Sequence, residues 1–244
     1  MKLIRFSRLA TAAVADWRPV DSAEHVYVKF HGLELQSAGG TRITLYYCQD
    51  PADATRTVVS TAACGTLAAP KQIDLLALTE GLAVELLDGH VLPAGRYDWI
   101  RLLVDTAGLR DSYIVTAGGA EVELTIPNGG ETGFKLTRGF HVPDGGSADL
   151  TVDFDLRKSV HVTRTGDYLL RPSLRLADNT LAGAIAGIVD PSRVPVGCTP
   201  AVYVFAGAGI APDDIGGMAT DPVTTATVKL DNGSGTYRYQ AAFL

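Results

Sequence analysis

The chain of 244 residues is long enough to form one large domain, or two smaller ones, with a buried core. Its composition, 46% hydrophobic and 20% charged, is that of a folded protein and excludes general disorder. The formal net charge of -6 argues against a nucleic-acid-binding protein, and no apolar run is long enough to predict a membrane span.

The N-terminal segment, residues 1–15, has two interpretations. Three basic residues precede the short apolar run Leu9 to Ala15, and Ala13-Val14-Ala15 has the small-x-small pattern of a signal-peptidase site. The run is at the lower length limit for the apolar region of a signal peptide. We therefore favour a first strand at Leu9 to Ala15 over a cleaved signal.

An alternation of apolar and polar residues is the dominant pattern along the chain. In the segment His25 to His31, Val26, Val28 and Phe30 share one face, which predicts a half-buried strand. Similar patterns between Gly, Pro, Asn or Asp residues predict strands at Arg42–Tyr47, Trp99–Val104, Ser112–Thr116, Glu121–Ile126, Gly133–Thr137 and Ala148–Leu156. Repeated short strands with turn residues favour an all-β sandwich or barrel.

One segment has helical spacing. Leu75 to Leu87 is rich in Leu at that spacing but is interrupted by Gly81, so we predict one or two helical turns. Further along, a strand at Ser173 to Leu176 ends at Asp178-Asn179, and we place a domain boundary near Asn179.

The segment after this boundary is expected to be a second β-module. Its predicted strands are Gly183–Val189, Ala201–Ala206, Thr224–Leu230 and Thr236–Ala242. Four strands make a poor closed module, so we expect residues 183–244 to form an incomplete module with an exposed edge strand.

The three cysteines, Cys48, Cys64 and Cys198, have no spacing typical of a metal site. Cys48 and Cys64 flank a polar segment that we interpret as a loop, and a disulfide between them across a hairpin would imply an oxidising compartment. Cys198 would then have no partner. The alternative is three buried free thiols.

Five segments resemble a bacterial family known as domain of unknown function 4382: Lys71–Leu78, Leu92–Leu102, Phe134–Phe140, Asp153–His161 and Tyr168–Arg175. The resemblance covers residues 16–180 and implies an immunoglobulin-like or related β-sandwich of the cell envelope, secreted or lipoprotein-like. Residues 183–244 are similar to the opening of a carboxypeptidase-regulatory-like or transthyretin-like β-module. The chain keeps Asp16 and Pro19 of the family's Thr-Asp-Ala-Pro turn, and no lipidation cysteine lies near its N-terminal segment.

Asp153, Asp155 and Arg157 alternate with apolar residues, which predicts that they share the face of a strand opposite the core. Two carboxylates on one face are candidate ligands for a calcium ion. His141 and His161 could join them in a metal site. We favour a solvated or cross-strand salt-bridged face, with Arg157 and Lys158 close enough to neutralise the acids and with no bound cofactor.

Tyr97, Trp99 and Tyr113, together with Trp17, are candidates for a platform on which a sugar stacks, although core packing is the simpler use of Trp99. The sequence has no nucleophile motif, and Ser159 near His161 does not fill the roles of a catalytic triad. We therefore expect a non-catalytic binding, adhesion or scaffold module of a bacterial envelope protein, with a protein or carbohydrate partner. A carbohydrate-binding module is the alternative, and a metal-binding protein or metal-assisted enzyme is the second alternative.

Overall fold

The structure is a computed structural model that describes residues 18–78, 81–87, 89–106, 108, 110–194, 196–197, 199–207, 213–217 and 220–244. The expected first strand, Leu9 to Ala15, and the alternative signal segment, residues 1–15, lie outside the described residues, as do Trp17 and Cys198. Among the described residues, no helix has the length and apolarity that crossing a membrane requires.

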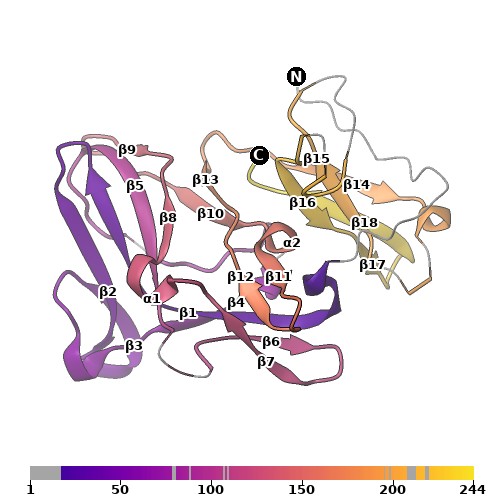
Figure 1. Cartoon of the computed structure of the whole chain (residues 1–244). Coiled ribbons are helices and arrows are strands. Elements are labelled where there is room, and N and C mark those ends of the chain that lie inside the picture. Colours follow the sequence, from indigo (N-terminus) through magenta and orange to yellow (C-terminus); the bar gives the residue numbers. More distant parts are fainter. Residues whose placement is uncertain are drawn as a thin grey trace.

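The protein is all-β and sandwich-like, as predicted (Figure 1). Its first thirteen strands are β1 (Ala23–Ser37), β2 (Arg42–Asp50), β3 (Asp53–Ser60), β4 (Lys71–Asp74), β5 (Gly95–Val104), β6 (Ser112–Thr116), β7 (Glu121–Thr125), β8 (Phe134–Leu136), β9 (Phe140–Val142), β10 (Leu150–Phe154), β11 (Val160–Val162), β12 (Tyr168–Leu170) and β13 (Leu174–Asp178). The later strands are β14 (Ile185–Val189), β15 (Ala201–Val204), β16 (Thr224–Thr227), β17 (Lys229–Asp231) and β18 (Thr236–Ala241). The described helical segments are single turns: α1 (Gly129–Thr132), α2 (Leu156–Ser159), and the 3-10 turns η1 (Pro19–Ser22), η2 (Gly65–Leu67), η3 (Leu75–Ala77) and η4 (Pro191–Arg193).

The long strand β1 organises the large sheet. Its first half pairs with β4 and β6, and its second half pairs with β2 and β5. Val26, Val28 and Phe30 are buried, as the alternation predicted, but the strand continues beyond His31 to Ser37. A register shift between Phe30 and Gly32 moves the buried positions to Leu33 and Leu35, so both halves of the strand face the same core.

The polar segment after Cys48 is not a loop. It contains β3, which pairs with β2 at the end of the large sheet; four of its eight residues are exposed and none is buried. A strand at the edge of a sheet with no covered face has no apolar alternation, which is why its sequence looked like a loop. The short helix predicted within Leu75 to Leu87 is the single turn η3.

The strand predicted at Ala148 to Leu156 is shorter than expected. β10 ends at Phe154, and the chain then turns into α2, with Asp155 as the residue that caps it. Asp155 and Arg157 are both buried, so the prediction that they share an exposed strand face with Asp153 was wrong. The reason is local: a carboxylate that accepts a backbone N–H favours the start of a helical turn over a continued strand.

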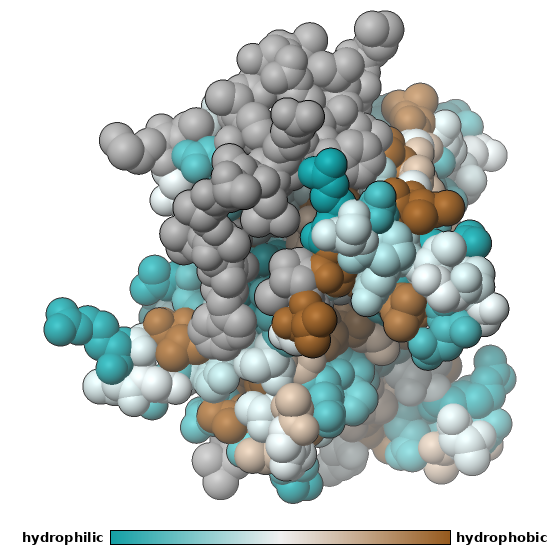
Figure 2. Space-filling view, turned by 90° about the vertical axis from the view of Figure 1, so that its right-hand side faces the viewer, coloured by the Kyte–Doolittle hydropathy of each residue, from teal (hydrophilic) through white to brown (hydrophobic). Residues whose placement is uncertain are grey.

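Two clusters of buried apolar residues lie on either side of the chain segment that follows β13. We call residues 18–178 the first module and residues 183–244 the second module. The first cluster lies within the first module, and the second contains Val202, Val204, Ala226, Val228, Tyr239 and Ala241. The second module has one sheet of order β14-β18-β17 and the separate pair β15-β16. Figure 2 views the molecule from the right-hand side of Figure 1, where the second module lies; on this face hydrophobic residues are interspersed with hydrophilic ones.

Candidate functional site

Asp153 forms a cross-strand ion pair. It lies on β10 directly opposite Arg175 of β13, whose Nε and Nη2 atoms donate to Asp153 Oδ2 at 3.2 and 2.5 Å. The cross-strand salt bridge favoured from the sequence is therefore present for Asp153, but its partner is Arg175 rather than Arg157 or Lys158. Both side chains are about a quarter exposed, which is the environment of an ordinary sheet-face ion pair.

Asp155 connects the two modules. Its Oδ1 accepts a hydrogen bond from the Lys158 backbone N–H at 3.2 Å, which caps α2. Thr225 of β16, in the second module, donates its backbone N–H to Asp155 Oδ2 at 3.0 Å and its hydroxyl to Oδ1 at 2.9 Å. Burial raises the pKa of Asp155, and the hydrogen bonds from Thr225 and Lys158 oppose this shift only in part.

The neighbouring basic residues Arg157 and Lys158 also form hydrogen bonds to the second module. Arg157 forms an ion pair with Asp21 of η1 and donates to the Tyr203 hydroxyl of β15 at 3.3 Å, with its guanidinium over the Tyr203 ring. Lys158 Nζ donates to the backbone carbonyl of Pro222. We call this group of contacts the inter-module joint; its members are Asp155, Arg157 and Lys158 on one side and Tyr203, Pro222 and Thr225 on the other.

The two candidate histidines lie on separate strands. His141 is exposed on β9, which pairs with β5, and His161 is exposed on β11, which pairs with β12. Although the residue is exposed, partial desolvation of its ring and the charge of Arg171 lower the pKa of His161. In the part of the chain that the structure describes, no three His, Cys, Asp or Glu side chains come close enough together to hold a metal ion.

Ser159, near His161 in the sequence, is fully buried at the end of α2. Its hydroxyl donates to the Asp155 carbonyl at 2.6 Å and accepts from the Ser173 N–H at 2.8 Å. The hydroxyl therefore satisfies backbone groups around the inter-module joint.

The candidate aromatic residues do not form an open row. Tyr97 is 1% exposed, stacks on Phe140 at 4.9 Å between ring centroids, and donates its hydroxyl to the Pro93 carbonyl. Trp99 is 7% exposed because three basic side chains lie over its ring at 4.5 to 5.7 Å: Arg42, Arg101 and Lys135. Such contacts of cations with an aromatic face are attractive, so this cover is stable in itself.

Tyr113 belongs to a different group, which the sequence pattern did not indicate. Its ring stacks on Tyr27 at 4.8 Å, and Tyr27 stacks on His25 at 5.5 Å. His25 Nδ1 lies 2.6 Å from Asp74 Oδ2. The alternating sequence pattern places His25 and Tyr27 on one face of a strand. It cannot show that Tyr113 joins them, because this depends on the register in which β6 pairs with β1.

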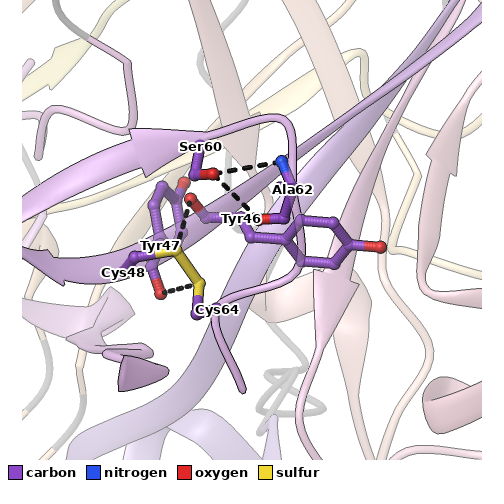
Figure 3. Close-up of a disulfide and its surroundings, with 6 residues drawn as sticks. All are labelled: Tyr46, Tyr47, Cys48, Ser60, Ala62 and Cys64. Atoms are coloured by element: carbon purple, nitrogen blue, oxygen red, sulfur yellow. Dashed lines mark hydrogen bonds between the residues drawn. A yellow bond between two sulfur atoms is a disulfide. The ribbon is translucent and has the colours of Figure 1, made fainter. Parts of the chain in front are cut away.

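Cys48 and Cys64 form a disulfide, shown in Figure 3. Their Cα atoms are 5.4 Å apart, within the usual range for this bond. Cys48 lies on β2, and Cys64 follows β3, so the bond ties the chain beyond the edge strand back to the sheet. Of the two interpretations left open by the sequence, the structure has the bridged form for this pair.

A cavity of about 710 Å³ lies between the large sheet and the β10-β13 pair, and Phe243 of the second module also contributes to its lining. The two sets of strands contribute opposite walls, among them Phe30, Leu33 and Leu102 on one side and Val152, Phe154 and Leu176 on the other. β10 and β13 lie between the large sheet and the second module in Figure 1. No site at this place was predicted from the sequence.

Another side of the cavity is formed by the segment between η3 and β5, and residues 146–149 line the cavity as well. We call its described residues 81–87 and 89–92 the cover segment; they form neither helix nor strand. Leu82, Val84 and Val91 of this segment are 63%, 45% and 89% exposed. The Leu-rich pattern that suggested an interrupted helix was the one sequence signal of this apolar cover.

Together, these features define an all-β, disulfide-containing protein with an apolar cavity and a polar contact between two modules. The chain belongs to the family described as Domain of unknown function (DUF4382), whose model matches residues 11–172. This match confirms the resemblance seen in the sequence. Comparison with the curated proteins gives no match, and comparison with the solved structures gives none either.

Proposed function

We propose that this protein is a non-catalytic scaffold and binding module of a bacterial cell envelope, in which the first module holds the second in a fixed orientation. The observation that carries the proposal is the inter-module joint. Asp155 and Arg157, the charged residues that were candidates for chemistry, are buried and bonded to the second module.

The chemistry of the joint favours one orientation over many. Buried carboxylates and guanidinium groups must be hydrogen-bonded to offset their lost hydration, and those bonds are directional. Moving the second module would separate Asp155 from Thr225 and Arg157 from Tyr203 and leave buried charges without these partners. The inter-module joint therefore fixes the orientation of the second module, whereas a purely apolar contact would allow the two modules to slide along each other.

The disulfide supports an exported location. Disulfides persist in oxidising compartments such as the bacterial periplasm and cell surface and are rare in the cytosol. The Cys48–Cys64 bond, with the family resemblance, therefore favours the cell envelope. For the second module we propose a carboxypeptidase-regulatory-like fold, supported by its two antiparallel sheets around a separate apolar cluster.

Two alternatives are less well supported. Sugar stacking on Trp99 would require Arg42, Arg101 and Lys135 to leave its ring, and Tyr97 is buried. Metal binding by Asp153, Asp155, His141 and His161 would require groups on separate strands to converge. Neither alternative has an observation that favours it over the scaffold.

The proposal is tested by measuring whether the two modules have one orientation in solution. Small-angle X-ray scattering of the wild-type chain should fit a single compact conformation. Thr225→Val, which removes the hydroxyl donor to Asp155, should broaden the distance distribution and speed proteolysis between Asp178 and Ile185. Thr227→Val is the matched control, since Thr227 is two residues further along the same strand and pairs with Ala201 rather than contacting Asp155.

Two results would contradict the scaffold. One is scattering of the wild-type chain that fits only a mixture of module orientations. The other is equal scattering and equal proteolysis of the Thr225→Val and Thr227→Val variants.

A further inference from the structure

We propose that the cavity of the first module binds a single aliphatic chain carrying an uncharged polar head group. This inference goes beyond the scaffold role and does not depend on it, because the cavity is lined mainly by the first module, with Phe243 the one lining residue from the described part of the second module, and no member of the inter-module joint lines it.

The size of the cavity points to a ligand. Protein interiors are packed as densely as organic crystals, and voids larger than a water molecule are few. This cavity, of about 710 Å³, is open to solvent beside the exposed Leu82 and Val91, so it is a cleft that a ligand can reach rather than a sealed void. It falls in the range of about 300–1,000 Å³ that small-molecule sites occupy.

The lining selects an aliphatic occupant. Leu33, Leu35, Ile100 and Leu102 face the cavity from the large sheet, and Leu150 and Val152 face it from β10. These aliphatic side chains offer water no hydrogen-bond partner, whereas an apolar molecule gains from leaving water; polar residues such as Ser147, Thr151 and Asn179 also belong to the lining and can contact a polar head group. Branched aliphatic side chains on both walls suit a flexible hydrocarbon chain.

The cover segment provides the way in. Leu82, Val84 and Val91 line the cavity and are also substantially exposed to solvent, and the described residues around them form no helix or strand. Exposed apolar side chains at the edge of an apolar cavity are typical of a binding site. A bound chain would bury part of this surface.

Charges at the edge of the cavity select the head group. The carboxylates of Glu85 and Asp149 belong to exposed residues of the lining, and Asp153 is paired with Arg175. Among the described residues on this side, His90 also lines the cavity, and the Lys71 ammonium donates to the backbone carbonyl of Glu85. A ligand carboxylate would meet net negative charge here, so an uncharged hydroxyl head group is favoured over a fatty-acid anion.

The test is a fluorescence titration of the full chain with N-phenylnaphthylamine, an uncharged apolar dye. Saturable binding at one dye per chain is expected. Dodecanol should displace the dye, and dodecanoate at neutral pH should do so about tenfold less well, a difference of about 1.4 kcal/mol. In the double variant Glu85→Gln, Asp149→Asn, dodecanoate should displace the dye almost as well as dodecanol does.

Two substitutions test the location of the site. Ala148→Trp and Ser147→Trp each place a large ring where a small exposed residue lines the cavity, and each should weaken dye binding about tenfold or more. Ala52→Trp is the control; Ala52 is an exposed residue of the turn between β2 and β3, and dye binding should not change. Circular dichroism identifies any variant that fails to fold, and having two cavity variants keeps the comparison usable.

The proposal is overturned if the dye does not bind saturably, or if folded cavity variants bind it as well as Ala52→Trp. Equal displacement by dodecanol and dodecanoate from the wild-type chain would overturn the assignment of an uncharged head group. None of these outcomes bears on the module orientation measured by scattering, so the two proposals fail separately.

Discussion

The carboxylate of Asp155 accepts both the backbone N–H and the hydroxyl of Thr225, across a sequence separation of 70 residues. The same carboxylate caps α2 through the Lys158 N–H. One side chain thus ends a strand, starts a helical turn and holds a strand of the other module. Local structure in the first module and the position of the second are set by the same group.

Replacing Asp155 with Ala is expected to lower the free energy of unfolding by about 2–3 kcal/mol, because a helix cap is lost and the Thr225 donors lose their acceptor. Asp155→Asn should cost less, because its amide oxygen can still accept from the Lys158 N–H and the Thr225 hydroxyl, whereas its NH2 group cannot accept from the Thr225 N–H. Urea denaturation followed by circular dichroism measures both. Equal losses for the two variants would mean that the charge, rather than the hydrogen bonds, matters at this position.

The raised pKa of Asp155 predicts a pH dependence of stability. Burial, as the largest cause, raises the pKa in the folded state above the ordinary value of 3.8, so the folded protein holds this proton more tightly than the unfolded chain. The contribution of this group to stability is therefore fully present below the ordinary pKa and is lost as pH rises through the folded value.

This dependence is measured as the difference in unfolding free energy between the wild-type chain and Asp155→Asn, at neutral pH and near the ordinary Asp pKa. Other titrating groups contribute similarly to both proteins and largely cancel. As the pH falls, the unfolding free energy of the wild-type chain should increase relative to that of Asp155→Asn. A decrease in the relative unfolding free energy of the wild-type chain as the pH falls would show that the Thr225 and Lys158 hydrogen bonds outweigh the cost of burial.

The strands predicted from the sequence were those that cover a core. Val26, Val28 and Phe30 alternate because one face of β1 is buried, and the class of fold followed from such segments. β3 was missed because its exposed edge position imposes no alternation. Asp155 and Arg157 continued an alternating pattern beyond the end of β10, and their contacts with Thr225 and Tyr203 depend on tertiary structure alone.

The candidate sites show the same division. Sequence spacing could place Asp153 on a strand, but only the register brings it opposite Arg175. The cavity could not be predicted, because its walls come from strands that are distant in the sequence and a void depends on how they pack. Leu residues near Gly81 gave the one local sign, and they were interpreted as a short helix.

Removing the disulfide with Cys48→Ala and Cys64→Ala is expected to lower the free energy of unfolding by about 3 kcal/mol, because a loop of this length loses its closure in the unfolded chain. Urea denaturation of the double variant measures this change. Intact mass of the wild-type chain from an oxidising preparation should show two hydrogens lost. Similar midpoints for the oxidised and dithiothreitol-reduced wild-type chain would contradict a stabilising role.

Gly32 is required by the close approach of β2. A Cβ atom at this position would lie 2.1 Å from the Leu45 carbonyl oxygen, a backbone atom held in the pairing of β1 with β2. Gly32→Ala is therefore expected to lower the free energy of unfolding by about 3 kcal/mol, since strands on both edges of β1 prevent relaxation.

Gly39→Ala is the matched control for this prediction. Gly39 lies in the turn after β1, where the nearest atom to an added Cβ would be Ser37 Oγ at 3.8 Å, an ordinary contact. Thermal or urea denaturation should show a large loss for Gly32→Ala and a change of about 0.5 kcal/mol or less for Gly39→Ala. Similar small losses would mean that β2 can move away from β1, and the register shift at Phe30 and Gly32 would then not be fixed by the close approach of the two strands.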